Sequence, residues 1–173
     1  MLLKTGLKKY KCNVGTNSMF FPVGEYLLTV TGRMYSPQKR TIKHRSLGLP
    51  VIKWLDFPTM HFYKYEFNKM YESNKFYYSC LLEEGDELKI FYSHNTCRIG
   101  GLVCLGSATG DGYLCKNDLD MDEFISLFWQ TEFSGLIYGN LFTNFLKIMP
   151  ILWRNEGNFL KNSGFNFYDI ENG

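Results

Sequence analysis

Alanine is almost absent from this sequence, with Ala108 the only one among 173 residues. A chain without the strongest helix former is a poor candidate for an all-helical bundle. Charge of one sign is also lacking, because 19 Lys and Arg face 17 Asp and Glu and leave a formal net charge of +2. Such a balance does not indicate a nucleic-acid partner, whose binding domains usually carry a clear basic excess. No stretch approaches the roughly 20 apolar residues that a membrane helix needs.

The cysteines lack any CxxC pair and are odd in number. Neither a closed disulfide framework nor a paired zinc clip is therefore indicated, and we expect reduced thiols and no bound metal. The N-terminal segment has only a short apolar stretch, residues 1–3, before Lys4. It therefore does not resemble a signal peptide. These features predict a soluble, cytoplasmic protein. The five cysteines are Cys12, Cys80, Cys97, Cys104 and Cys115.

Aromatic residues are abundant, at 17% of the chain, and they favour pleated strands over helices. Apolar and polar residues alternate in several segments that turn residues separate, as expected of strands. Basic residues between 38 and 45 fit a solvated loop or hairpin face better than a phosphate-binding edge. The predicted strands cover residues 24–35, 60–67, 75–82 and 87–92, with an acidic turn at 83–86 joining the last two.

The spacing of apolar residues changes after residue 118, where they recur every three or four positions, as on one face of a helix. Asp118 or Asp120 can cap this helix, which should bury Phe124, Ile125 and Phe128. A second helix is predicted over residues 140–149, where Pro150 would end it.

Strands followed by helices indicate an α+β fold in a single domain spanning residues 1–173. The segment from about residue 154 carries scattered aromatic residues, and we expect it to pack as an irregular C-terminal strap.

Residues 93–112 hold five glycines, two cysteines and one histidine between the last predicted strand and the first helix. Loops between rigid elements are where functional sites concentrate. The segment has no phosphate-binding or dinucleotide-binding fingerprint, so no nucleotide or other cofactor is expected. A metal site is disfavoured because the gaps between its His and Cys residues are irregular. A papain-like pairing of Cys104 with His44 or His61 lacks that family's signature around the cysteine.

One motif in this segment is more specific. Residues 101–105 read Gly-Leu-Val-Cys-Leu, and His94 stands ten residues before Cys104. This arrangement resembles the active-site stretch of ubiquitin-conjugating E2 enzymes, in which a His-Pro-Asn triplet precedes a Gly-x-Ile/Val-Cys-Leu motif. Asn95 stands where the triplet has proline, and Thr96 where it has asparagine.

The sequence that follows is similar to one group of these proteins. Residues 128–133 read Phe-Trp-Gln-Thr-Glu-Phe, which resembles the Phe-Trp-x-Ser/Thr-x-Phe element of the prokaryotic E2-like proteins, in particular family D and PRTRC system protein B. The resemblance spans residues 88–133. It implies the E2, or UBC-like, fold: an antiparallel strand meander packed against helices, with the active-site loop between the last strand and the first long helix.

The resemblance also implies an activity. Cys104 would accept a ubiquitin-like protein as a thioester from an E1-like, ThiF-related adenylating enzyme and pass it to an amine or thiol, with a JAB-type peptidase as a further partner. His94 would order the loop and Asn95 could donate to the developing oxyanion. Two other classes stay open: a catalytically silent α+β interaction module, and a single-stranded nucleic-acid binder, which would need exposed aromatic residues flanked by Lys or Arg.

Overall fold

A computed structural model describes most of the first 132 residues and one later strand. Its described residues are 5–14, 24–46, 49–68, 74–84, 89–93, 95–96, 101–105, 110–111, 114–132 and 165–169. This part of the chain is mostly antiparallel sheet with a single short helix, which is an α+β composition. None of its helices is long and apolar enough to cross a membrane.

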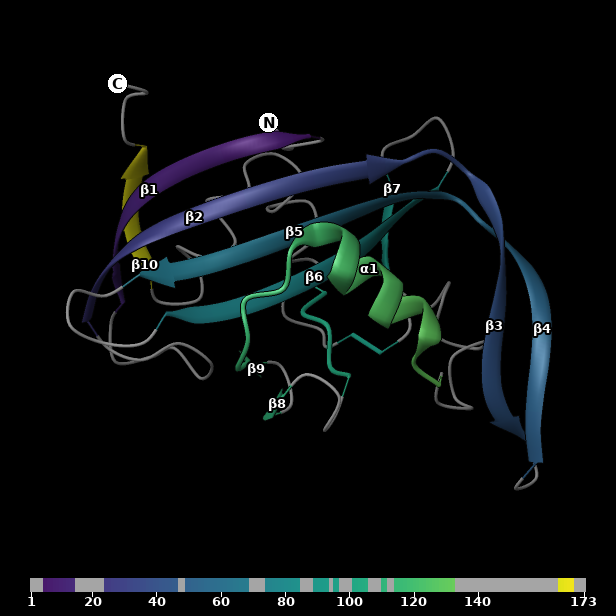
Figure 1. Ribbon diagram of the computed structural model, residues 1–173. Helices are drawn as coiled ribbons and strands as arrows, with labels where there is room; N and C mark the ends of the chain where they lie inside the picture. Colours follow the sequence, from purple (N-terminus) through teal and green to yellow (C-terminus); the bar gives the residue numbers. More distant parts are fainter. Residues whose placement is uncertain are drawn as a thin grey trace.

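The main sheet runs in the order β10-β1-β2-β5-β6-β9-β8, and β7 also pairs with β6. All of these pairings are antiparallel (Figure 1). The strands are β1 (Gly6–Val14), β2 (Gly24–Tyr35), β5 (Thr59–Asn68), β6 (Lys75–Glu84), β7 (Lys89–Tyr92), β8 (Gly110–Asp111), β9 (Leu114–Cys115) and β10 (Phe165–Asp169).

The centre of the sheet is buried on both faces. Met60 and Phe62 of β5 join the core beneath the helix, whereas Tyr63 and Tyr65 alternate with them along the strand and are equally buried. Strands buried on both sides need apolar or aromatic residues at nearly every position, which accounts for the aromatic content of the chain.

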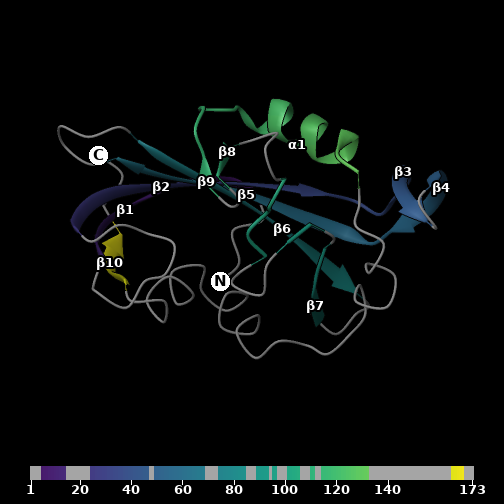
Figure 2. The same cartoon turned by 90° about the horizontal axis from the view of Figure 1, so that it is seen from below.

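β2 and β5 continue into a second, two-stranded sheet made by β3 (Gln38–Ser46) and β4 (Leu49–Phe57). We call this pair the β3–β4 ribbon. Pro37 and Pro58 lie at the junctions, where each removes a backbone donor and interrupts the ladder. The ribbon consequently bends away from the main sheet and projects beyond its end (Figures 1 and 2).

The helix α1 (Met121–Gln130) covers one face of the sheet (Figure 2). Its N-terminus has a reciprocal capping box: the Glu123 backbone N–H donates to Asp120 Oδ1 at 2.8 Å, and the Asp120 N–H donates to Glu123 Oε2 at 3.0 Å. Phe124 stacks on Tyr78 with ring centroids 4.2 Å apart. The residues of α1 buried against the sheet are Met121, Phe124, Ile125 and Phe128.

Side chains from the sheet fix the chain leading into α1. The Tyr78 hydroxyl donates to the Leu119 carbonyl at 2.6 Å and accepts from the Leu119 N–H at 3.0 Å. Lys64 forms an ion pair with Asp118. The start of the helix is therefore held by β5 and β6 as well as by its own cap.

The predicted strands at 24–35, 60–67 and 75–82 are confirmed, and so is the helix with its cap and buried face. Glu83 and Glu84, expected in a turn, still belong to β6. β1 was not foreseen. Residues 38–45, expected in a solvated loop or hairpin face, lie in β3, which forms a hairpin with β4. Within the predicted irregular strap, residues 165–169 form a regular strand on β1. The predicted second helix lies outside the described residues.

Candidate functional site

The motif around Cys104 lies along one edge of β6. The Cys80 N–H donates to the Gly101 carbonyl at 3.0 Å, and the Val103 N–H donates to the Tyr78 carbonyl at 2.7 Å. Leu102 forms an antiparallel bridge with Ser79 between them. These bonds attach the motif to the rigid centre of the sheet, which positions the next residue, Cys104.

Gly101 is required for this close approach. Its φ of +65° lies in the left-handed region, which residues other than glycine rarely adopt. A Cβ at this position would stand 2.6 Å from the Cys80 carbonyl oxygen and 2.6 Å from Leu81 Cδ2. The glycine of the Gly-x-Val-Cys motif thus serves the contact with β6.

Cys104 is a free cysteine and is half-buried, between the buried side chains of Val103 and Leu105. Its backbone N–H donates to the Asn95 carbonyl at 2.7 Å, and Val103 pairs with Thr96. The two parts of the recognised pattern, which are separated by several residues in the sequence, therefore lie side by side.

Asn95 connects the Cys104 strand to the end of α1. Its backbone is left-handed, with a φ of 53°, a conformation that Asn tolerates better than most residues. Its Nδ2 lies 3.4 Å from the Glu132 carbonyl oxygen and donates to it. The next residue, Thr96, donates from Oγ1 to the Ser93 carbonyl at 2.5 Å. Local hydrogen bonds thus hold the turn that supports Cys104.

The other described thiols are in different surroundings. Cys80 is fully buried, and loss of solvation raises the pKa of its thiol, although a hydrogen bond with Ser93 acts in the opposite direction. Burial also raises the pKa of Cys115, whose Sγ donates to the Asn117 carbonyl at 3.1 Å. A thiol needs its thiolate form to act as a nucleophile, so Cys80 and Cys115 are poor candidates for chemistry.

Of the residues named from the sequence, the structure brings Asn95 and Cys104 together through a backbone hydrogen bond. His94 lies outside the described residues, as does Cys97. No group of three metal-ligating side chains occurs within the described ranges. His61, considered as a base for Cys104, is buried in β5 with its Nε2 2.7 Å from Glu83 Oε2. The Glu132 carbonyl was missed, because a backbone group carries no sequence signal.

Comparison with known proteins yields no matching family model, no matching curated protein and no matching solved structure.

Proposed function

We propose that this protein is an E2-like carrier that accepts a ubiquitin-like protein as a thioester on Cys104 and transfers it to an acceptor amine or thiol. The observation that carries the proposal is the placement of Cys104: a half-buried free thiol on a segment bonded to both β6 and Asn95. The E2, or UBC-like, fold belongs to the same proposal, supported by an antiparallel sheet whose cysteine segment precedes a packed helix.

The chemistry requires a thiol that is held in place and remains accessible. Cys104 Sγ attacks the thioester carbonyl on the E1-like, ThiF-related enzyme, a new C–S bond forms, and the C–S bond to the donor cysteine breaks. The proton from Cys104 ends on the released donor thiolate, so the exchange needs no cofactor. In a second attack, an acceptor amine forms the amide C–N bond, the C–S bond to Cys104 breaks, and the proton lost by the amine returns Cys104 to its thiol form.

Asn95 has a positioning role in this proposal. Its carbonyl accepts from the Cys104 N–H, and its side chain is directed to the Glu132 carbonyl, so it fixes the thiol between β6 and the end of α1. The side-chain amide nitrogen carries a second N–H, and that is the donor it would offer to an oxyanion. His94 keeps the loop-ordering role that the resemblance implies.

The test is a charging assay with the E1-like enzyme and ubiquitin-like protein of the same organism, with ATP. We expect an adduct that thiol reductant cleaves, because a thioester exchanges with thiols and an amide does not. Cys104→Ala should abolish the adduct, whereas Cys104→Ser should give a reductant-resistant oxyester. Cys115→Ala is the matched control, since it removes a buried thiol and should charge normally.

Two results would contradict the proposal. Charging of the Cys104→Ala protein would place the thioester elsewhere. Failure of the folded wild-type protein to charge, with an active E1-like enzyme that charges itself, would favour a silent interaction module in which Cys104 only packs.

A further inference from the structure

The β3–β4 ribbon has two faces with different surroundings. Directly opposed residues of an antiparallel pair share a face, and alternate residues along each strand return to it. Lys39 pairs with Asp56 and Thr41 pairs with Trp54, and all four side chains are exposed. We call this the outer face of the ribbon. On the alternate positions, Arg40 is half-buried and Phe57 is buried.

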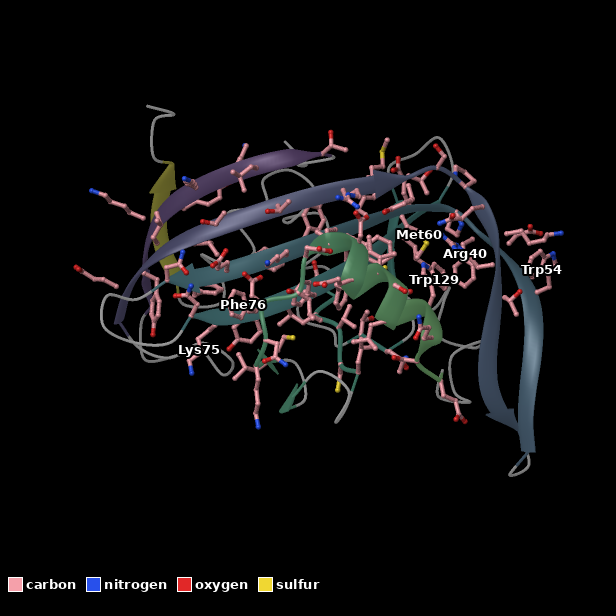
Figure 3. The ribbon with its side chains drawn as sticks, in the orientation of Figure 1. Arg40, Trp54, Met60, Lys75, Phe76 and Trp129 are labelled. Atoms are coloured by element: carbon pink, nitrogen blue, oxygen red, sulfur yellow. The ribbon has the colours of Figure 1, made fainter. Side chains whose placement is uncertain are left out.

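Trp54 is the most exposed large apolar side chain among the described residues, with 66% of its surface accessible. It projects from β4 on the side away from α1 (Figure 3). Burying an indole gains a large apolar area, so a tryptophan left exposed on a regular strand is a candidate contact for a ligand. An indole ring is also a flat surface on which a nucleobase can stack.

Basic residues accompany Trp54 on this face. Lys39 is exposed and stands two residues before Thr41, the residue that pairs with Trp54. Lys43 and Arg45 occupy the next two alternate positions of β3 after Thr41. Alternate residues of a strand recur about every 7 Å, twice the rise per residue. The outer face therefore offers a row of cationic positions along one strand and an aromatic ring on its partner.

The charge of the ribbon differs sharply from that of the rest of the chain. Residues 38–57 contain five Lys or Arg and one acidic residue, Asp56, which gives a formal charge of +4. Since the whole chain carries +2, the remaining residues carry −2. The nearly neutral total thus conceals a basic projection on an otherwise slightly acidic protein.

The inner side of the ribbon is fixed to the body of the protein. The Arg40 guanidinium lies over the Trp129 ring, 5.0 Å from its centroid, and Phe57 meets the same ring edge-on at 5.0 Å. Figure 3 shows Arg40 and Trp129 together between the ribbon and α1. This packing holds the base of the ribbon, so the outer face is presented in a set orientation and a ligand need not order it.

We propose that the outer face of the β3–β4 ribbon binds single-stranded nucleic acid, with Trp54 stacked on a base, Lys39 at a phosphate, and the basic strand positions 43 and 45 adding positive charge along the same face. Charge complementarity favours a polyanion, and the exposed indole favours a partner with free aromatic faces. Bases within a duplex are already stacked on one another, whereas a single strand has free base faces that can stack on the indole. This site is separate from Cys104 and does not rest on the proposed conjugating activity.

The test is a titration of fluorescein-labelled (dT)20 with the full chain, followed by fluorescence anisotropy at 50 and 200 mM NaCl. We expect saturable binding whose affinity falls about 20-fold over this range, as three phosphate contacts on a single strand predict. Trp54→Ala should lower the affinity about tenfold while keeping the salt dependence, and Trp54→Phe should retain most of the binding. Asp56→Asn should tighten binding because it removes the anion beside Lys39.

The charge arm uses Lys39→Gln, Lys43→Gln and Arg45→Gln together, which should remove most of the salt dependence. Its matched control is Lys9→Gln with Lys11→Gln, two exposed lysines of β1, which should bind as the wild type does. Circular dichroism confirms that each variant is folded.

No binding at 50 mM NaCl would overturn the proposal, and so would equal affinity for a 20-base-pair duplex. Equal competition by polyglutamate would instead identify an acidic protein partner and would also overturn it.

Discussion

The described cysteines differ by the solvent that reaches each sulfur. Cys80 is 0% exposed on the central strand β6, and Cys115 is 3% exposed in β9, whereas Cys104 is only half-buried. Burial penalises the charged thiolate and raises the pKa of both Cys80 and Cys115. Reactivity toward an electrophile should therefore separate the three residues without any partner protein.

We expect iodoacetamide at pH 8 to alkylate Cys104 at least ten times faster than Cys80 in the folded protein, because the nucleophile is the accessible thiolate. Peptide mass spectrometry after timed quenching gives the order of labelling. In urea, where burial is lost, the two rates should become similar. Labelling of Cys80 before Cys104 under native conditions would be inconsistent with the described burial.

At the scale of the elements, α1 depends on a cap that is visible in the sequence. Asp120 satisfies the Glu123 N–H, and Glu123 returns a bond to the Asp120 N–H. Asp120→Ala removes the acceptor and should lower the free energy of unfolding by about 1 kcal/mol, measured by urea denaturation. Asp120→Asn retains an acceptor oxygen and should cost much less, so equal losses in the two variants would mean that the cap is unimportant.

Gly101 makes a second prediction at this scale. Gly101→Ala places a Cβ against the Cys80 carbonyl in a left-handed backbone, so the segment must move away from β6. We expect a loss of about 3 kcal/mol or more from strain and lost hydrogen bonds, with faster hydrogen exchange at Cys80 and Val103. Ser36→Ala, at an exposed position between β2 and β3, is the control. An unchanged unfolding midpoint for Gly101→Ala would contradict the described approach.

How far the sequence predicts these elements depends on how local their causes are. α1 and the strands at 24–35 and 75–82 follow from spacing and capping within each segment. β1 carries lysines at positions 8, 9 and 11 and becomes a strand because β2 and β10 pair with it, which no local pattern indicates. At the site, the resemblance named Asn95 and Cys104, and the backbone hydrogen bond between them comes from the structure. The support from β6 and from the Glu132 carbonyl is backbone contact between distant segments, so only the structure reveals it.

At the scale of the whole molecule, buried tyrosines link stability to pH. Loss of solvation raises the pKa of Tyr77 to about 12 from its ordinary value of 10.0, and burial shifts the pKa of Tyr78 in the same direction. The folded state thus holds the phenol protons more tightly than the unfolded state does. The stability that this difference provides is fully present below pH 10 and is lost as the pH rises toward 12.

We therefore expect the urea midpoint to fall steeply between pH 10 and 12. Tyr77→Phe cannot ionise and should make that fall shallower, whatever its effect on stability at pH 8. Midpoints measured at half-unit intervals of pH test the slope directly. Parallel curves for the wild type and Tyr77→Phe would mean that Tyr77 does not contribute to the alkaline loss.

The two long edges of β6 are covered in different ways. One edge has a continuous partner, β5, whereas the other is shared by β9, Leu102 and β7 in turn. A bare strand of this length and apolar character would be a template for another copy of the chain. The segment that carries Cys104 therefore also occupies the middle of that edge, where another copy of the chain would otherwise pair. Variants that loosen it should aggregate on expression, which would be mistaken for loss of activity unless the soluble fraction is measured first.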